Sequence, residues 1–422
     1  MAPWTFAANQ RALGFYRRHG WRPDSAERIH ERAGRRGGFA SDWKRPNAEA
    51  MGARHNESAM TVTFAQKLAQ IPHYEPGTSL DEARARAETP DAIKLASNES
   101  PYPPHPKVVE AIAAAAAEVN RYPDPAATVL RRRIAERHDT EPGRIAVGNG
   151  SCEILLAAAA ALCEQGAELI FAWPAFSIYP YLAPLSGARE VRVGLDAEER
   201  HELDAIAAEI TAATQLAIVC NPNNPTATYV GAERVRAFLE RVPSHVTVIL
   251  DEAYIEYQVT DDPDTTADLL LAFPNLVLLR TFSKCYGLAG IRVGYALCSP
   301  QFRAAVDAVR QPFSVNAIAQ AAAAEAILHQ DDVANRVEKT LVERVFVEEG
   351  LRELGISTAE SESNFAWLDL GERDEAEVTE SLARAGVAVR PGTPLGGPGH
   401  LRVTYGTRSE NERFLSALAD AI

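Results

Sequence analysis

The feature that most constrains the fold is an alternation, from about residue 106 onward, of short apolar runs with helical stretches. Several runs are rich in β-branched residues and each is bounded by turn residues, as buried strands are. Strands that alternate with helices form crossover units, so the sequence predicts an α/β protein with a mostly parallel sheet between helices. The runs are Arg144–Val147, Glu168–Ala172, Leu216–Cys220, Val246–Leu250, Leu276–Leu279 and Arg292–Leu297. The helical stretches are Lys107–Val119, Ala127–His138, Ser151–Glu164 and Ala232–Arg241.

A second, smaller α/β region is predicted from about Val315. Its helix candidates are Ala317–Leu328, Val333–Leu354 and Glu375–Ala385, and its strand candidates are Asn364–Leu370, Val387–Arg390 and Leu401–Tyr405. A chain of 422 residues is long enough for two domains. We therefore predict a large domain at 106–313 and a small domain at 314–422, preceded by an N-terminal arm at 60–105.

Composition and charge argue against several classes of function. The longest apolar run, Ile154–Cys163, is ten residues, whereas a helix that spans a bilayer needs about 20, so no membrane is expected. The net charge is −14, and the acidic residues dominate after residue 59, which argues against nucleic acid as the main partner. The five cysteines are scattered and lack the spacing of a metal site. We expect no metal and no disulfide framework, and a reducing cytoplasm as the location.

Residues 1–59 differ from the rest of the chain. Asn9–Trp21 reads NQRALGFYRRHGW and is similar to the C-terminal signature of the GNAT N-acetyltransferases, N-x-x-A-x-x-F-Y-x-x-x-G-W. A complete acetyltransferase is far longer and needs a glycine-rich loop for acetyl-CoA, so we expect no acetyl transfer. Residues from Gly34 to Met60 have the polar, glycine-rich composition of a poorly ordered linker. Two readings remain, a fused tail of an adjacent gene and a start assigned too far upstream. We favour the second, with Met60 as the natural start.

Lys284 lies in an apolar segment punctuated by glycines, TFSKCYGLAGIRVGY. An ammonium group resists losing water, and a lysine is a nucleophile only when desolvation or nearby cations lower its pKa. Taken alone, a lysine in a loop is more often a surface residue. However, the motifs NPNNPT, DEAY and TFSK each follow an apolar run. In parallel sheets that edge is where ligands bind.

Asp251 ends the apolar strand VTVIL. A carboxylate there either caps the next turn or faces a buried cation, such as the pyridinium nitrogen of pyridoxal 5′-phosphate (PLP). Tyr254 is either a packing tyrosine or a donor to the phenolate oxygen of the same ring. Asn224 lies in the turn NPNNPT and could direct its amide to that oxygen.

A phosphate would find candidate donors on both sides of Lys284. Gly150 directly precedes the helical stretch that starts at Ser151, and glycines before a helix leave N–H groups for a phosphate, although most such turns only start helices. Ser283 and Arg292 flank Lys284 at distances that let both reach one phosphate. Phe176, in AWPAFSIYP, is either a core aromatic or a side chain that stacks on a ring.

Together these motifs resemble the fold-type I PLP-dependent aminotransferases, in the branch of histidinol-phosphate and aromatic amino acid aminotransferases. The similarity covers nearly all of the chain after Met60, from about Lys94 to Thr407. The motifs are specific in combination: KLASNESPYPP, NRYPD, GNGSCE, NPNNPT, DEAYIEY, TFSKCYGLAGIRVGY and LRVTYGT, in that order. The resemblance implies an aspartate-aminotransferase-like fold, PLP as cofactor, and a transaminase that exchanges an amino group with glutamate and 2-oxoglutarate.

The resemblance also implies a role for each motif residue. Lys284 would bind the cofactor covalently and later carry the proton that moves during the exchange. Arg402, with help from Arg390 and Tyr102, would contact the substrate. Tyr122 would reach the phosphate of the neighbouring subunit's cofactor, so a homodimer with shared sites is implied. The other cofactor contacts would be Asp251 at the ring nitrogen, Asn224 and Tyr254 at the phenolate oxygen, Phe176 at the ring face, and Gly150, Ser151, Cys152, Ser283 and Arg292 at the phosphate.

Three residues depart from the family pattern. Cys152 stands where the branch commonly has aspartate, a change that a backbone contact would survive. Ala227 replaces the usual glycine after NPNNPT, and Ser100 stands where some relatives have a substrate-contacting Tyr or Asn. Ala227, NFAWLDLG and IPHYEPG resemble the aromatic amino acid aminotransferases. We favour L-histidinol phosphate, a substrate of histidine biosynthesis, and keep an aromatic amino acid as the alternative.

Two more distant alternatives use the same scaffold. A decarboxylase similar to the threonine-phosphate decarboxylases would release CO₂ without an amino acceptor. A transcription regulator of the PLP fold would carry a winged helix before this domain. Here the preceding segment resembles an acetyltransferase instead, and the body of the chain is acidic. These two features argue against the regulator. Both alternatives are less favoured than the transaminase.

Overall fold

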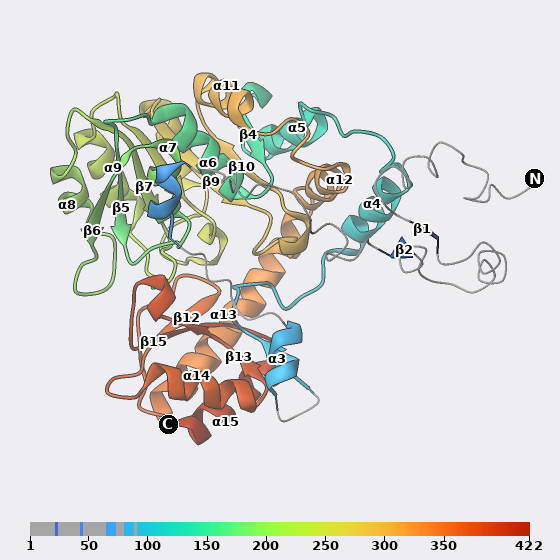
Figure 1. Cartoon of the computed structure of the whole chain (residues 1–422), viewed down its shortest axis with the longest axis vertical. Helices are drawn as coiled ribbons and strands as arrows, with labels where there is room; N and C mark the ends of the chain where they lie inside the picture. The colour runs from blue at the N-terminus through green and yellow to red at the C-terminus, as the bar shows by residue number, and fades with distance from the viewer. Residues whose placement is uncertain (1–21, 24–42, 45–64, 73–79, 88–90) are drawn as a thin grey trace, which may run out of the picture. The chain divides into compact units, whose positions relative to one another are not determined.

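The computed structural model in Figure 1 describes residues 22–23, 43–44, 65–72, 80–87 and 91–422. The chain divides into two compact units, Met1–Phe64 and Ala65–Ile422. In the first unit the described residues form two short strands, β1 (Arg22–Pro23) and β2 (Trp43–Lys44), which pair in antiparallel orientation. The acetyltransferase-like segment and the expected start at Met60 lie outside the described residues.

The centre of the second unit is a seven-stranded sheet in the order β4-β10-β9-β8-β7-β5-β6. Its strands are β4 (Ile145–Gly148), β5 (Glu168–Trp173), β6 (Arg189–Gly194), β7 (Thr214–Cys220), β8 (Thr247–Asp251), β9 (Leu276–Thr281) and β10 (Gly294–Leu297). Strands β6, β5, β7, β8 and β9, which are neighbours in that order, pair in parallel. Strand β10 is antiparallel to both of its neighbours, β9 and β4. The predicted mostly parallel sheet is confirmed. Each strand predicted for this sheet begins and ends within two residues of its predicted bounds.

Helices cover both faces of this sheet, as Figure 1 shows. They are α4 (Pro106–Ala116), α5 (Thr128–Arg137), α6 (Ser151–Leu162), α7 (Tyr179–Ser186), α8 (Leu203–Ala208), α9 (Ala232–Arg241), α10 (Leu269–Ala272), α11 (Pro300–Val309) and α12 (Ala317–Ala326). Successive side chains of a strand point to opposite faces. Val248 and Leu250 of β8 therefore pack into one buried cluster with α4, α5, α9 and α12. Ile249, between them, packs into a second cluster with α6, α7 and α11.

A four-stranded antiparallel sheet forms the C-terminal part, in the order β11-β12-β15-β14. Its strands are β11 (Ser357–Thr358), β12 (Phe365–Asp369), β14 (Arg390–Pro391) and β15 (His400–Thr404), and the helices around it are α13 (Gln330–Glu353), α14 (Glu375–Arg384) and α15 (Arg408–Ala421). Leu351, Val378 and Phe414 of these helices share one buried cluster with Leu368 and Val403 of the sheet. The predicted division at 60–105, 106–313 and 314–422 stays a prediction.

The predicted strand Val387–Arg390 is wrong as one continuous strand. Its first half, β13 (Val387–Ala388), pairs in parallel with β3 (Ile93–Lys94), whereas β14 begins at Arg390 and pairs with β15. The chain changes partner at Val389, because residues 93–95 insert beside β13: Leu95 N–H donates to Ala388 O at 2.8 Å. The pairing of a strand with a segment distant in sequence cannot be predicted from a local pattern of hydrophobic residues.

Several elements of the described chain were missed by the sequence analysis. Strand β6 has the sequence REVRVG and is half-exposed at the edge of the large sheet, so its charged residues hide the apolar pattern. Helix α15 begins with a capping box in which Thr407 and Glu410 bond each other's backbone N–H groups. The segment η3 (Gln66–Gln70) and helix α3 (Leu80–Arg86) complete the second unit. Among the helices of the described ranges, none is long and apolar enough to cross a membrane.

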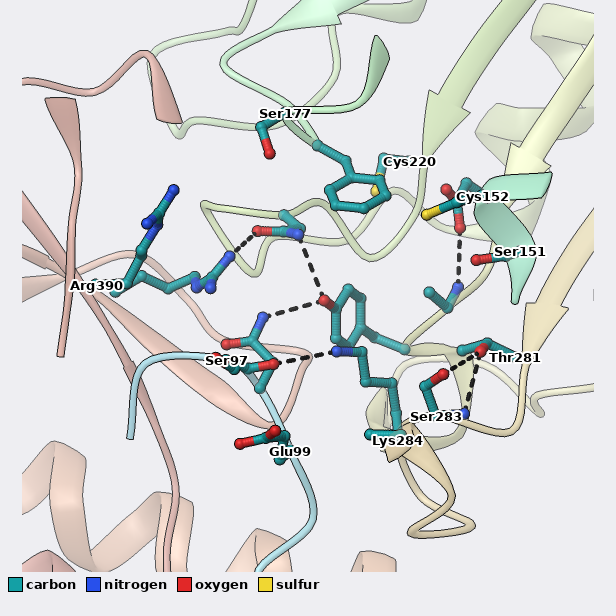
Figure 2. Close-up of a pocket in the computed structure, with 18 of the residues that line it drawn as sticks. Ser97, Glu99, Ser151, Cys152, Ser177, Cys220, Thr281, Ser283, Lys284 and Arg390 are labelled. Carbon is teal, nitrogen blue, oxygen red and sulfur yellow. Dashed lines mark hydrogen bonds between the residues drawn. The ribbon is translucent and has the colours of Figure 1, made fainter. Parts of the chain in front are cut away.

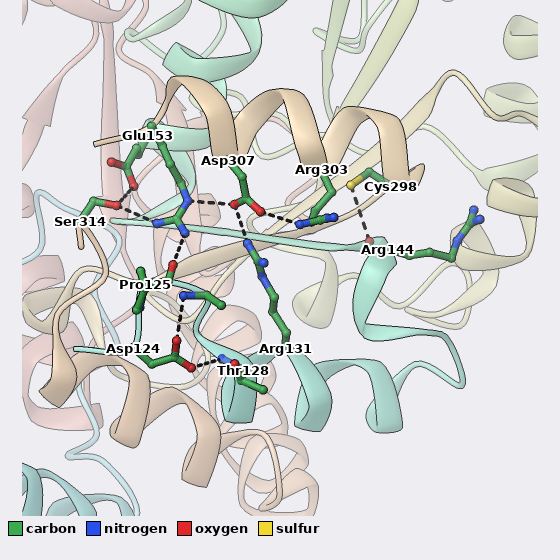
Figure 3. A network of polar contacts seen from close by, with 12 residues as sticks. Asp124, Pro125, Thr128, Arg131, Arg144, Glu153, Cys298, Arg303, Asp307 and Ser314 are labelled. Carbon is green, nitrogen blue, oxygen red and sulfur yellow. Dashed lines mark hydrogen bonds and ion pairs between the residues drawn. The ribbon is translucent and has the colours of Figure 1, made fainter. Parts of the chain in front are cut away.

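A chain of polar contacts connects α5 and α11 with the start of α6 (Figure 3). The Asp307 carboxylate accepts from Arg131 at 2.6 Å and from Arg310 at 3.0 Å. Arg310 also donates to Ser314 Oγ at 3.3 Å, and Ser314 donates to Glu153 Oε2 at 2.8 Å. Because Glu153 lies in the first turn of α6, this network fixes the helix end that faces the pocket described below.

Candidate active site

A pocket of about 360 Å³ lies at the carboxyl ends of β7, β8 and β9, where Cys220, Asp251 and Thr281 end their strands. Residues 96–99 and side chains from the C-terminal sheet line its other side. Figure 2 shows both groups of side chains directed into the same space. The predicted site residues that line the pocket are Ser151, Cys152, Phe176, Asn224, Asp251, Tyr254, Ser283, Lys284, Arg292, Arg390 and Arg402.

Lys284 follows the end of β9 and extends its amino group into this pocket (Figure 2). Its Nζ donates to Ser97 O at 3.3 Å and lies 5.4 Å from the centre of the Tyr254 ring. Burial and, to a lesser extent, the positive charge of Arg402 lower the pKa of Lys284 to about 8. A substantial fraction of this amine is therefore neutral near physiological pH, as a nucleophile or proton acceptor requires.

Asp251 is the last residue of β8 and is 2% exposed. Its Oδ2 accepts from the Tyr179 hydroxyl at 2.8 Å, and its Oδ1 accepts from Ala253 N–H at 3.3 Å. Burial raises the pKa of this carboxyl to about 6, while these two donors oppose the rise. A buried carboxylate of this kind would be stabilised by a cationic group in the pocket.

Tyr254 is at the centre of a hydrogen-bonded cluster opposite Lys284. Its hydroxyl accepts from Asn98 Nδ2 at 3.0 Å and from Asn224 Nδ2 at 3.4 Å, which leaves the phenol proton to donate into the pocket. Arg402 in turn donates to Asn224 Oδ1 at 2.5 Å and to Ala96 O at 2.9 Å. A ligand bound at Arg402 would therefore be coupled to the groups that surround Tyr254.

The start of α6 and the loop after β9 form a cradle for an anion. Arg292 Nη1 lies 3.5 Å from Ser283 Oγ, and a Cβ added at Gly150 would overlap the Arg292 guanidinium. Gly150 also has φ +75°, a conformation that favours glycine. A Cβ added at Gly294 would lie 2.5 Å from Ser151 N. These close approaches bring a cation, a hydroxyl and the first N–H groups of α6 together, as phosphate binding requires.

The departures at Cys152 and Ala227 have different structural consequences. Cys152 lines the pocket, and burial raises the pKa of its thiol. It therefore remains a neutral thiol there, while the helix N–H groups do not depend on its side chain. Ala227 is buried and has φ +66°, which costs an L-residue roughly 1 kcal/mol. A glycine at this position avoids that cost.

Tyr102 and Tyr122 do not line the pocket of this chain. The ring of Tyr102 lies 5.4 Å from Lys339 Nζ. Tyr122 is 83% exposed and stacks on Phe313, with 4.7 Å between the ring centres. Their predicted roles in binding substrate and the neighbouring subunit's cofactor stay predictions.

Sequence reasoning missed four polar groups at this site. Asn98 and Ser97 lie in the quoted motif KLASNESPYPP, and Thr281 lies at the start of TFSK, so each was within reach of a motif argument. Thr281 Oγ1 is 3.0 Å from Ser283 Oγ. Tyr179 lies in AWPAFSIYP, three residues after Phe176, but nothing in that pattern indicates a contact with Asp251.

The sheet is mostly parallel, and Lys284, Asp251 and the anion cradle line one pocket at its edge. This combination defines the class of fold-type I PLP enzymes. Within that class, the chain belongs to the family "Aminotransferase class I and II", whose family model matches residues 90–418. It is 43% identical over 349 residues to an aromatic amino acid aminotransferase of Streptomyces coelicolor, with 83% of this chain and 94% of that protein covered. It is also 43% identical over 351 residues to histidinol-phosphate aminotransferase 2 of Pseudomonas fluorescens, with the same coverage.

Solved structures give the same fold. The histidinol-phosphate aminotransferase of Sinorhizobium meliloti in complex with PLP is similar with a TM-score of 0.77 and 28% identity, over 87% of this chain and 99% of that chain. An aspartate aminotransferase of Thermus thermophilus with maleate has a TM-score of 0.74 and 25% identity, over 86% and 100%. The predicted aspartate-aminotransferase-like fold, the transaminase activity and PLP as cofactor are confirmed.

The residues of the pocket fit this cofactor. The Arg292 guanidinium lies so close to Gly150, at the start of α6, that an added Cβ would overlap it, and this cation beside helix N–H groups suits a phosphate. The buried carboxyl of Asp251 suits a protonated ring nitrogen, and Lys284 supplies the amine. The chemistry of each donor therefore agrees with PLP.

Proposed function

We propose that this enzyme is a histidinol-phosphate transaminase, which takes the amino group of L-histidinol phosphate and passes it to 2-oxoglutarate. The observation that carries this proposal is the pair Arg390 and Arg402, which are 6% and 7% exposed and line the same pocket. Two buried guanidinium groups suit a phosphate-bearing amine and the dicarboxylate glutamate in turn.

An aromatic amino acid is the second candidate. Leu395, 3% exposed, and Phe176 give the pocket an apolar portion beside the arginines. The relatives named for the two activities are equally similar to this chain, at 43% identity. The phosphorylated substrate is favoured because its phosphate can engage both arginines, whereas phenylalanine offers them only one singly charged carboxylate.

We propose that each pocket residue acts on a defined atom. PLP, when bound, supplies an electrophilic carbon for the amine and a ring that accepts an electron pair. Lys284 holds or moves a proton at its Nζ, and Asp251 keeps the ring nitrogen protonated. Tyr254 and Asn224 donate to the phenolate oxygen, and Arg402 orients the substrate's anionic group.

The same proposal assigns the remaining cofactor contacts. The phosphate is bound by Gly150, Ser151 and Cys152 at the start of α6 and by Ser283 and Arg292 beside Lys284, as the cradle geometry supports. Phe176 covers the ring face and, with Leu395, excludes water.

The substrate is tested by mixing the PLP-loaded enzyme with one amine and no oxo acid. The visible absorbance of the bound cofactor is expected to fall faster with L-histidinol phosphate than with L-phenylalanine. The Arg390→Ala variant should lose more of its rate with histidinol phosphate than with phenylalanine, by about tenfold for a charge-assisted contact. A fast reaction with phenylalanine and none with histidinol phosphate would establish the alternative substrate.

We also propose that the enzyme is a cytoplasmic homodimer with shared sites. Exposed apolar residues, Val109, Val119, Tyr122, Val129 and Phe313, lie on α4 and α5 and in the segments that follow α4 and α11. All five cysteines are free thiols, as suits a reducing compartment. Light scattering is expected to give twice the chain mass of 45.8 kDa.

In that dimer, Tyr122 is proposed to contact the phosphate of the cofactor bound by the other subunit. Tyr122→Phe should keep the dimer and weaken PLP affinity several-fold, because it removes one hydrogen bond to an anion. A fully active monomer at micromolar concentration would refute the shared site. Unchanged PLP affinity in the variant would refute the role of Tyr122 alone.

A further inference from the structure

Tyr179 makes a buried contact with the carboxylate at the centre of the site. It is the first residue of α7, and its side chain is 0% exposed. Its hydroxyl donates to Asp251 Oδ2 at 2.8 Å, across 72 residues of sequence. The other oxygen, Oδ1, accepts from Ala253 N–H. Together these two donors fix the rotation of the carboxylate, and Tyr179 does so without lining the pocket.

The same tyrosine also contacts Phe176. The two rings meet edge to face, with 5.8 Å between their centres and 82° between their planes, and Tyr179 N–H donates to Phe176 O at 3.0 Å. Phe171 of β5 packs on Tyr179 from another side, at 5.7 Å. The buried Tyr179 side chain therefore contacts both Asp251, the proposed partner of the cofactor nitrogen, and Phe176, which is proposed to cover the cofactor ring.

We propose that Tyr179 is a positioning residue for the cofactor. It holds Asp251 and Phe176 in the positions from which they contact the pyridine ring. This proposal rests on the roles proposed above for Asp251 and Phe176. Tyr179 acts through these two side chains, because its hydroxyl donates to Asp251 while Tyr179 itself does not line the pocket. A tyrosine hydroxyl in this position also favours the ionised carboxylate that a protonated ring nitrogen requires.

The electrostatic effect follows from the groups around Asp251. The titratable groups that face it are Tyr179, Cys220, Cys152, Tyr254, Glu252 and Lys284. The pKa of Asp251 is already raised to about 6 by burial, and the hydroxyl of Tyr179 is the leading contribution against that rise. Replacing Tyr179 with phenylalanine removes this donor and moves the pKa of Asp251 further up.

The sign of the pH effect is fixed by linkage. A carboxyl whose folded pKa is above its unfolded value binds more protons when folded, so the stability of the cofactor-free protein falls as pH rises through that interval. For the parent this interval runs from about 4 to about 6. In Tyr179→Phe it extends to higher pH. The difference in Tm between parent and variant is therefore expected to grow by about 2 °C between pH 5 and pH 8.

The matched control is Tyr229→Phe. Tyr229 is 7% exposed, its hydroxyl donates to Asp261 Oδ2 at 2.9 Å, and it does not line the pocket. Equilibrium titration of the cofactor-free enzyme with PLP at pH 8 is expected to give a Kd about tenfold weaker for Tyr179→Phe, about 1.4 kcal/mol. Tyr229→Phe should bind PLP within about twofold of the parent, whatever stability it loses.

Three outcomes separate the proposals. A weaker Kd together with a Tm difference that grows with pH supports the positioning role of Tyr179. If Tyr179→Phe binds PLP like Tyr229→Phe while Asp251→Ala loses PLP, the role of Tyr179 is refuted and that of Asp251 stands. If Asp251→Ala itself keeps the parent's PLP affinity at every pH, the proposed role of Asp251 fails, and the inference drawn for Tyr179 fails with it.

Discussion

Alanine in place of Lys284 is expected to abolish turnover and to remove the visible absorbance of the lysine-bound cofactor, while the protein stays folded. The amine at this position is unusual because its pKa is lowered to about 8, chiefly by burial. Among the described residues that line the pocket it is the one lysine. No neighbouring side chain can therefore take over the nucleophilic and proton-carrying role proposed above for Lys284. Absorbance spectra and steady-state rates of the PLP-saturated variant would measure both effects.

The stability of the cofactor-free Lys284→Ala protein should change with pH in a defined direction. Between pH 8 and 10.5 the unfolded lysine holds a proton that the folded one lacks, so the parent gains stability as pH rises. At neutral pH the buried ammonium costs the parent on the order of 3 kcal/mol. The variant lacks this cost. Its Tm relative to the parent should therefore be higher at pH 7 than at pH 10.5.

Two further variants at lysines sharpen this test. Lys284→Arg keeps a cation that does not lose its proton. It should be as inactive as the alanine variant and less stable at neutral pH. Lys107, in α4, has a side chain that is 62% exposed, and Lys107→Ala should keep both activity and absorbance. Transamination retained by Lys284→Ala at a rate near that of the parent would overturn the assignment of this lysine.

The groups at strand ends could be predicted because their position follows from short-range patterns. Asp251 directly follows three apolar residues, Val248–Leu250, and Asn224 lies in a proline-rich turn directly after another strand. In a parallel sheet the ends of neighbouring strands meet at one edge, so Lys284, after β9, was expected near both. The pairing of Cys220 with Asp251 and of Asp251 with Leu279 shows that β7 and β8 end side by side and that β9 continues two residues further at the same edge.

The remaining contacts could not be predicted, because they join segments with no local signal for each other. Asn98 donates to Tyr254 across 156 residues, and Arg402 donates to Ala96 across 306. Asn98 is buried with φ +52°, held there by Thr404. A hydrophobic pattern indicates which face of a strand is buried, but not which distant polar group meets it.

Removal of the Asp251 carboxylate is expected to lower turnover by at least 10²–10³-fold, the scale of a lost electrostatic contact to charge that develops in the reaction. Asp251→Ala should also bind PLP more weakly, because it lacks the carboxylate at the end of β8 that is proposed to face the ring nitrogen. Asp251→Asn keeps the size and an oxygen that can accept from Tyr179, so it should bind PLP better than the alanine variant while remaining as slow. Single-turnover rates and PLP titrations separate these two effects.

The pH dependence of stability identifies the group responsible. The folded pKa of Asp251 is about 6 against an ordinary value of 3.8, so the cofactor-free parent loses on the order of 3 kcal/mol as pH rises from 4 to 6. Asp251→Asn has no such loss, and its Tm relative to the parent should rise over the same interval. Asp261→Asn removes a carboxylate that accepts from Tyr229 outside the pocket, and should leave turnover unchanged. Near-normal turnover in both Asp251 variants would show that the ring nitrogen is bound elsewhere.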